Sequence, residues 1–290
     1  MTDTTTYRTL DVPGATIAYD VRGPLPTADG RPPLVLIGQP MDASGFGTLA
    51  TYLTDRTVVT YDPRGLGRST RTDGTDRQDP RQQAEDLHAL VTELGTGPVE
   101  LFGSSGGAVT GLAWVTAYPD DVATLVAHEP PLVHLLPDAE RALAADARVS
   151  AAYAERGWGA GMAAFIVMTS WEGEFPEDFL AELPDPAQFG MPTEDDGTRD
   201  DPLLSDASKA VSGYEPDVDA LRASQTRIVL AAGEESLAII TGRATQSLAD
   251  LLGTTVEVFP GGHGGFLGDE FGMPGKPEEF AARLREVLGA

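Results

Sequence analysis

The chain of 290 residues contains no cysteine. Disulfide bonds, thiolate zinc sites and cysteine nucleophiles are therefore excluded. A chain of this length can bury enough apolar surface to fold without covalent or metal cross-links. The sequence accordingly predicts one large domain, or a core domain that carries an insertion.

Basic residues are scarce: 20 Lys and Arg stand against 45 Asp and Glu, for a formal net charge of −25. This charge repels phosphate backbones and anionic membranes, so neither nucleic acid nor a membrane is expected as a partner. No apolar run approaches the roughly 20 residues of a membrane span, and the polar segment 1–10 lacks the pattern of a secretory signal. We expect a cytoplasmic protein with a small-molecule substrate. A homodimer stays open, because the sequence does not fix the oligomeric state.

Short apolar runs bounded by turn residues recur along the chain, which is typical of strands buried on both faces of a parallel sheet. Helices are predicted between them at 82–94 and 108–118, and a closing helix at 277–288. This alternation predicts an α/β fold with a doubly wound, mostly parallel sheet. The predicted strands are 16–21, 34–37, 57–61, 99–102, 122–127, 227–230 and 255–259.

The alternation stops after Pro130-Pro131 and resumes near residue 225. The segment between is helical in tendency, with alanine-rich stretches and many aromatic residues. We therefore predict a core domain of residues 1–130 and 225–290, interrupted by a helical cap domain of residues 131–224.

The segment Gly103-Ser104-Ser105-Gly106-Gly107 has the form G-x-S-x-G, with Ser105 at its centre. It follows an apolar strand and precedes a helix, as a nucleophile elbow does. The flanking glycines are needed because a Cβ in so tight a turn would collide with backbone. Ser105 is the predicted nucleophile, and the N–H of Gly106 at the helix N-terminus is a predicted oxyanion donor. The alternative is a plain glycine-rich turn.

A serine nucleophile needs a neighbouring base, and the chain has four histidines: His88, His128, His134 and His263. Only His263 follows the last predicted strand, inside a glycine-rich loop, so it is the predicted base. A structural loop histidine is the alternative. His88 lies on an amphipathic helix and is interpreted as a surface residue.

Four segments occur in the same order as in a known superfamily. They are Leu36-Ile37-Gly38-Gln39-Pro40, Asp62-Pro63-Arg64-Gly65-Leu66-Gly67-Arg68-Ser69, the elbow, and Gly261-Gly262-His263-Gly264-Gly265. With them, residues 16–288 resemble the α/β-hydrolase superfamily with an inserted cap. The resemblance implies the α/β-hydrolase fold and serine hydrolase chemistry.

The segment Ile37-Gly38-Gln39-Pro40 resembles the H-G-x-P oxyanion motif of that superfamily, with Ile37 in place of histidine. The resemblance implies that the backbone N–H of Gln39 is the second oxyanion donor, since proline has no N–H. The D-x-R-G-x-G-x-S segment implies a tight structural turn, and Arg64 is not expected to be catalytic.

The resemblance leaves the catalytic acid open. The family usually supplies an aspartate in a G-x-x-D pattern, but here Gly233-Glu234-Glu235-Ser236 puts serine at that position. Haloalkane dehalogenases and certain lactone hydrolases carry the acid after the strand that follows the elbow helix, where this chain has Glu129. We predict Glu129 as the acid that orients His263, with Glu234 or Glu235 as alternatives.

The predicted cap is rich in aromatic and methionine side chains at helical spacing, which usually form a packing core. A cap must also lie over the carboxyl ends of the strands, where sites of such folds open. Some of these side chains are therefore expected to line an apolar pocket. The predicted substrate-binding residues are Met41, Trp158, Phe165 and Trp171.

Together these features predict a serine hydrolase that cleaves a carboxylic ester or lactone of an apolar small molecule, without metal or organic cofactor. Ser105 argues against dehalogenases and epoxide hydrolases of the superfamily, which need aspartate as nucleophile. A cofactor-free perhydrolase or haloperoxidase, and a lyase or cyclase using the same pocket, stay open. So does a non-catalytic small-molecule receptor on the hydrolase fold.

Overall fold

The structure is a computed structural model that describes residues 5–272 and 274–289. Residues 1–4 of the polar N-terminal segment, in which no secretory signal was expected, lie outside the described residues. The strands are β1 (Thr5–Val12), β2 (Ala15–Arg22), β3 (Leu34–Ile37), β4 (Val58–Tyr61), β5 (Thr70–Arg71), β6 (Val99–Ser104), β7 (Val122–His128), β8 (Arg227–Gly233) and β9 (Val256–Phe259).

The α-helices are α1 (Gly47–Thr51), α2 (Pro80–Leu94), α3 (Gly106–Ala117), α4 (Ala139–Arg156), α5 (Trp158–Thr169), α6 (Lys209–Ser212), α7 (Val218–Ala223), α8 (Ile240–Leu252) and α9 (Pro277–Leu288). Short 3₁₀ helices are η1 (Ala43–Phe46), η2 (Val133–Leu135), η3 (Pro186–Phe189), η4 (Asp206–Ser208) and η5 (Glu270–Gly272). Within residues 5–272 and 274–289, no helix has the length and apolar character needed to cross a membrane.

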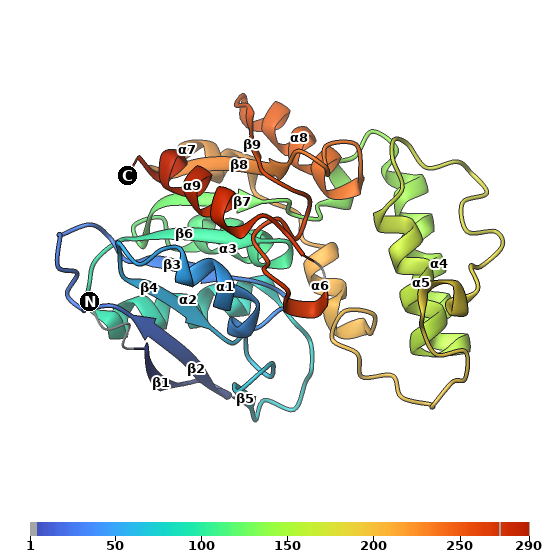
Figure 1. Ribbon diagram of the computed structural model, residues 1–290, viewed down its shortest axis with the longest axis horizontal. Helices are drawn as coiled ribbons and strands as arrows, with labels where there is room; N and C mark the ends of the chain where they lie inside the picture. Colours follow the sequence, from blue (N-terminus) through green and yellow to red (C-terminus); the bar gives the residue numbers. More distant parts are fainter. Residues whose placement is uncertain (1–4, 273, 290) are drawn as a thin grey trace.

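The strands form one twisted sheet in the order β1-β2-β4-β3-β6-β7-β8-β9, with β5 paired to β2 (Figure 1). The pairs from β4 to β9 are parallel, whereas β1, β2 and β5 add an antiparallel side. The predicted doubly wound, mostly parallel α/β sheet is thus confirmed. Strands β1 and β5 were not predicted, because β1 is largely exposed and reads as a polar segment, and β5 has only two residues.

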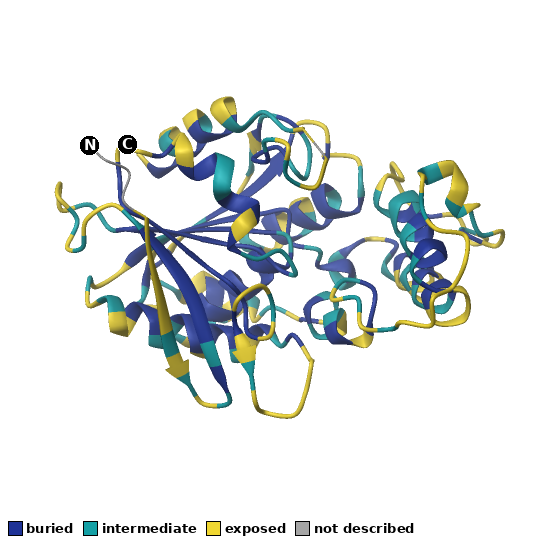
Figure 2. Cartoon of the chain, turned by 60° about the horizontal axis from the view of Figure 1, so that its bottom comes forward, coloured by how far each residue is buried: buried dark blue, intermediate teal, exposed yellow. Residues whose placement is uncertain are grey.

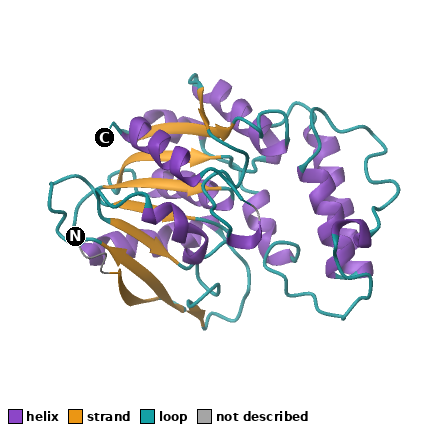
Figure 3. Cartoon of the chain, viewed as in Figure 1, coloured by secondary structure: helices purple, strands orange, loops and turns teal. Residues whose placement is uncertain are grey.

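Helices cover both faces of the sheet (Figure 3), and the alternation of side chains along each strand explains why. In β3, Val35 and Ile37 belong to the core beneath α2, α3 and α8, whereas Leu34 and Leu36 belong to the core beneath α1 and α9. All four side chains are fully buried. A strand apolar at every position is what two covered faces require.

The described residues between β7 and β8 contain helices and loops but no strand. In Figure 1, α4 and α5 stand beside each other beyond the carboxyl ends of the parallel strands. The buried stripe of each helix is visible in Figure 2, and in α4 it consists mainly of Ala142, Ala145, Val149 and Ala152. The boundaries 131 and 224 of the cap stay a prediction.

The D-x-R-G-x-G-x-S segment forms a polar turn beside the sheet, in which Asp62, Arg64 and Ser69 are buried. Nε and Nη2 of Arg64 donate to both carboxylate oxygens of Asp86, at 2.8 and 2.6 Å. The carboxylate of Asp62 accepts from the backbone N–H groups of Ala43 and Arg68. These contacts hold the segment after β4 against α2 and η1, so Arg64 is engaged in structural bonds.

Candidate active site

Ser105 sits in the sharp turn between β6 and α3, with φ = 57° and ψ = −126°. A positive φ is costly for a residue with a Cβ, by about 1–3 kcal/mol, and persists only where the surroundings enforce it. Here the surroundings are backbone: a Cβ on Gly107 would lie 2.3 Å from the carbonyl oxygen of Ile37, and one on Gly103 would lie 2.7 Å from that of Gly107. The glycines allow β6, α3 and the β3 loop to meet this closely.

The N-terminus of α3 faces the loop that follows β3. Helix geometry leaves the first amides of α3, beginning with Gly106, without an intrahelical acceptor. A Cβ on Gly106 would lie 2.7 Å from the carbonyl oxygen of Gln39, so the residues predicted to form the oxyanion hole are immediate neighbours. The positive end of the helix dipole adds to the attraction for an anion here.

Glu129 follows β7 directly and its side chain is fully buried. Nδ1 of His263 lies 2.6 Å from Oε2 of Glu129. The same carboxylate accepts from the backbone N–H of Gly233 at 2.9 Å and from the Thr241 hydroxyl at 2.5 Å. Glu129 itself has φ = 51°, and its N–H donates to the carbonyl of Ala231, which holds it against β8.

The contacts of this pair determine its charge state. Burial acts to raise the pKa of Glu129, but the hydrogen bond and charge of His263, with the Thr241 hydrogen bond, hold that pKa well below its usual range. Burial acts to lower the pKa of His263, but the carboxylate of Glu129 outweighs it and raises the pKa above 6.5. Glu129 is therefore ionised at neutral pH, and His263 keeps its proton on Nδ1.

The alternative acids lie elsewhere. Glu234 and Glu235 both pair with Nζ of Lys276, at 2.7 and 3.2 Å, and their side chains are more than half exposed. Ser236, at the position where the family pattern has aspartate, is buried. Neither glutamate is bonded to His263 among the described contacts, whereas Glu129 is.

The other histidines occupy different places. His88 bonds Asp121 at 2.7 Å and stacks on Tyr118, which follows the C-terminal end of α3, whereas the elbow lies at its N-terminal end. His134 lies half-buried in η2. His128 is fully buried next to Glu129, and no sequence motif predicted a role for it. Thr241 was missed as well, because a lone threonine at the start of a helix carries no signal of the carboxylate it contacts.

The predicted substrate-binding residues are spread over the edge and the helix pair. Met41 lies against Gly38 and Gly45, where its side chain leaves no room for a Cβ. Phe165 is half-buried on α5, and the indole N–H of Trp158 donates to Asp201 at 2.9 Å. The side chain of Trp171 is 38% exposed and contacts Phe179 edge to face. Their role toward a substrate stays a prediction.

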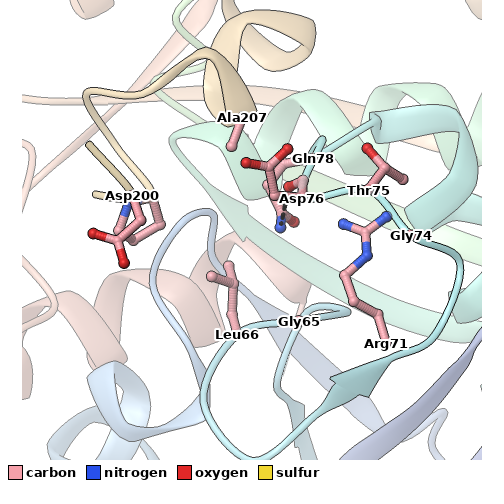
Figure 4. Close-up of a pocket in the computed structure, with 10 residues that line it drawn as sticks. Gly65, Leu66, Arg71, Gly74, Thr75, Asp76, Gln78, Asp200 and Ala207 are labelled. Carbon is pink, nitrogen blue, oxygen red and sulfur yellow. Dashed lines mark hydrogen bonds between the residues drawn. The ribbon is translucent and has the colours of Figure 1, made fainter. Parts of the chain in front are cut away.

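A cavity of about 710 Å³ opens where the loop after β4 meets the segment before α6 (Figure 4). Its wall is mixed in charge, because Arg71, Asp76 and Asp200 all line it. The Arg71 guanidinium is already held by Asp73 in a bidentate pair. The lining is Gly65, Leu66, Arg71, Gly74, Thr75, Asp76, Gln78, Asp200, Pro202 and Ala207, which includes none of the predicted site residues.

An elbow serine and a carboxylate–histidine pair at the carboxyl edge of a mostly parallel sheet define the α/β-hydrolase class of protein. The comparison with known families agrees: residues 30–283 match the alpha/beta hydrolase family, and the chain belongs to it. It is a hydrolase at the level of that family.

Among curated proteins, the chain is 39% identical over 129 residues to the uncharacterized hydrolase YraK of Bacillus subtilis (strain 168). That match covers 44% of this chain and 46% of the relative, so the chain spans about half the length of the relative it matches.

Solved structures extend the likeness over the whole fold. A thermophilic esterase from Thermogutta terrifontis has a TM-score of 0.64 at 22% identity, covering 99% of this chain and 98% of that one. An esterase from Exiguobacterium antarcticum has a TM-score of 0.65 at 18% identity, covering 98% and 99%. At these identities the likeness shows the fold.

Proposed function

We propose that the protein is a serine hydrolase that cleaves a carboxylic ester or lactone of an apolar small molecule, with Ser105 as nucleophile, His263 as base and Glu129 as acid. The observation that carries the proposal is the 2.6 Å contact between His263 Nδ1 and Glu129 Oε2, at the edge where the strained elbow presents Ser105. The esterases that share the fold favour an ester as substrate.

The proposed reaction is an acyl transfer in two halves. Nε2 of His263 takes the Ser105 hydroxyl proton as the oxygen attacks the ester carbonyl, and Glu129 stabilises the imidazolium that forms. The amides of Gly106 and Gln39 stabilise the oxyanion, each worth roughly 3 kcal/mol in the barrier. His263 then protonates the leaving alcohol. In the second half a water gives its proton to Nε2 and attacks the acyl-enzyme. His263 then returns that proton to the Ser105 oxygen as the acid product is released.

A fluorophosphonate probe tests the nucleophile. We expect the wild-type chain to be labelled at Ser105, as located by peptide mass spectrometry, and Ser105→Ala to lose labelling and ester hydrolysis. Ser236→Ala is the matched control, because the buried Ser236 hydroxyl has no hydrogen-bond partner among the described contacts. It should label like wild type. A folded wild-type chain that is not labelled would instead favour a non-catalytic receptor.

The pH dependence tests the base. His263 accepts a proton only when neutral, so kcat/KM should fall as the pH drops through its pKa. Because the carboxylate of Glu129 raises that pKa, the midpoint of the acid limb is expected above pH 6.5. Rates on p-nitrophenyl esters and macrocyclic lactones, measured from pH 5 to 9, give both this midpoint and the preferred substrate. A limb centred well below pH 6 would contradict the assignment.

A further inference from the structure

His128 is a buried titratable group that the proposed reaction does not use. It ends β7, directly before Glu129, and its side chain is 0% exposed. On its polar edges, Nδ1 lies 3.2 Å from the Ser104 hydroxyl and Nε2 lies 3.7 Å from Oε1 of Glu129. The rest of the ring is enclosed by aromatic side chains, namely Phe102, Phe259, Phe266 and Phe280.

The charge of His128 follows from this enclosure. Burial lowers the pKa of His128 to about 4, against the opposing effect of the Glu129 carboxylate. The charged groups that face it are Glu129 and His263, whose ring stacks on it with centroids 6.2 Å apart. At neutral pH the imidazole is therefore neutral and carries one N–H.

The position of that N–H is decided by the two polar neighbours. With the proton on Nδ1, the lone pair of Nε2 would face the ionised carboxylate of Glu129, which is repulsive. With the proton on Nε2, the N–H faces the carboxylate, and the Ser104 hydroxyl donates to Nδ1. At 3.7 Å the contact between Nε2 of His128 and Oε1 of Glu129 is too long for a full hydrogen bond and is an attraction between a dipole and a charge. The low dielectric of the interior strengthens this attraction.

We propose that His128 is a positioning residue that keeps Glu129 ionised, and that the Ser104 hydroxyl fixes the tautomer of the His128 ring. The positive edge of His128 then faces a carboxylate–histidine pair that has net charge −1 when His263 is neutral and 0 when it is protonated. This edge stabilises the state in which His263 is neutral, so His263 can act as a base at a lower pH than it could without His128. The proposal rests on the proposed function and adds two residues, from β6 and β7, behind the acid.

The proposal predicts a shift of the pH profile that a packing role would not cause. In His128→Phe the ring still fills the aromatic enclosure but has no N–H, so the pair should hold its proton more tightly. The midpoint of the acid limb of kcat/KM should shift to higher pH by about half a unit or more. Ser104→Ala leaves the tautomer free and should move it in the same direction by less. Phe280→Leu disturbs the same enclosure without a polar change, and should lower thermal stability but leave the limb in place.

A direct measurement reports the tautomer of His128 in the wild-type chain. Long-range ¹H–¹⁵N spectra of the wild-type chain, with His128 assigned by its absence in His128→Phe, report the tautomer. We expect a neutral ring protonated on Nε2 from pH 6 to 8. A ring protonated on Nδ1, a charged ring, or an unmoved limb in a folded His128→Phe each overturns the proposal.

The outcome for the proposed function is separate. If the wild-type chain is not labelled at Ser105, the proposed function fails whatever His128 does. If it is labelled and His128→Phe keeps the wild-type limb, only the role of His128 fails.

Discussion

The carboxyl edge of the sheet and the α4–α5 helix pair are built on opposite principles. At the edge, Ser105 and Glu129 have positive φ, and the Glu129 carboxylate is buried among donors. Within α4 and α5 the buried residues are mostly Ala and Gly, in ordinary helical conformation. Backbone strain and buried charge cost stability, so they occur where a fixed geometry serves a function. The small side chains of α4 and α5 only allow the two helices to pack closely. Substitutions should therefore affect turnover at the edge and binding or stability in the helix pair.

The largest effect should come from the acid. Glu129→Gln keeps the size of the side chain but loses the charge that stabilises the imidazolium and fixes the tautomer of His263. We expect kcat to fall by about 10⁴-fold. Glu235→Gln, which removes only a contact with Lys276, should change kcat by less than about twofold. Steady-state kinetics on a p-nitrophenyl ester measures both variants. Equal and mild losses of kcat in the two would show that another residue is the acid.

The next largest effect is expected from adding a Cβ at Gly107 in the elbow. In Gly107→Ala the new Cβ meets the backbone oxygen of Ile37 at 2.3 Å, and neither β3 nor α3 can withdraw from the core. We expect a loss of about 3 kcal/mol in the free energy of unfolding, measured by urea titration. Gly111→Ala on the same helix is the control. Its Cβ meets Leu125 Cδ1, the end of a movable side chain, at 2.9 Å. A Gly107→Ala variant as stable as Gly111→Ala would mean that the elbow is looser than described.

The sequence predicted the fold class and the family, and both are confirmed, because their signals are local. Apolar strands, G-x-S-x-G and the glycine-rich loop at His263 each lie within a few consecutive residues. The acid that pairs with His263 is distant from it in the sequence, by 134 residues for Glu129. Whether Glu129 or Glu234 meets it depends on how β7, β8 and β9 align, which the sequence left as alternatives. The contacts that Thr241 and His128 make with Glu129 were not predicted for the same reason.

Thr241 offers a smaller test of the same edge. Its hydroxyl donates to Oε2 of Glu129, the oxygen that also binds His263. Thr241→Val keeps the shape and removes this donor, so we expect kcat to fall by about tenfold with KM little changed. Thr245→Val, one turn further along α8, loses only a bond to the Thr241 carbonyl and is the control. Matching losses in both variants would indicate a general loosening of α8 instead of an effect on the acid.

The smallest effect is expected outside the edge, at Trp171, which follows α5. Its ring is partly exposed and packs edge to face on Phe179, with centroids 5.2 Å apart. If Trp171 lines the substrate pocket, Trp171→Ala should raise KM by about threefold to tenfold for esters with a large apolar acyl group, and leave kcat within about twofold. Small acetate esters should be unaffected, and the lost aromatic contact should cost about 1 kcal/mol of stability. Leu143→Ala removes an equally exposed apolar side chain from α4 and should leave KM unchanged. A KM that rises equally for acetate and long-chain esters would show that Trp171 supports the helix pair without contacting the substrate.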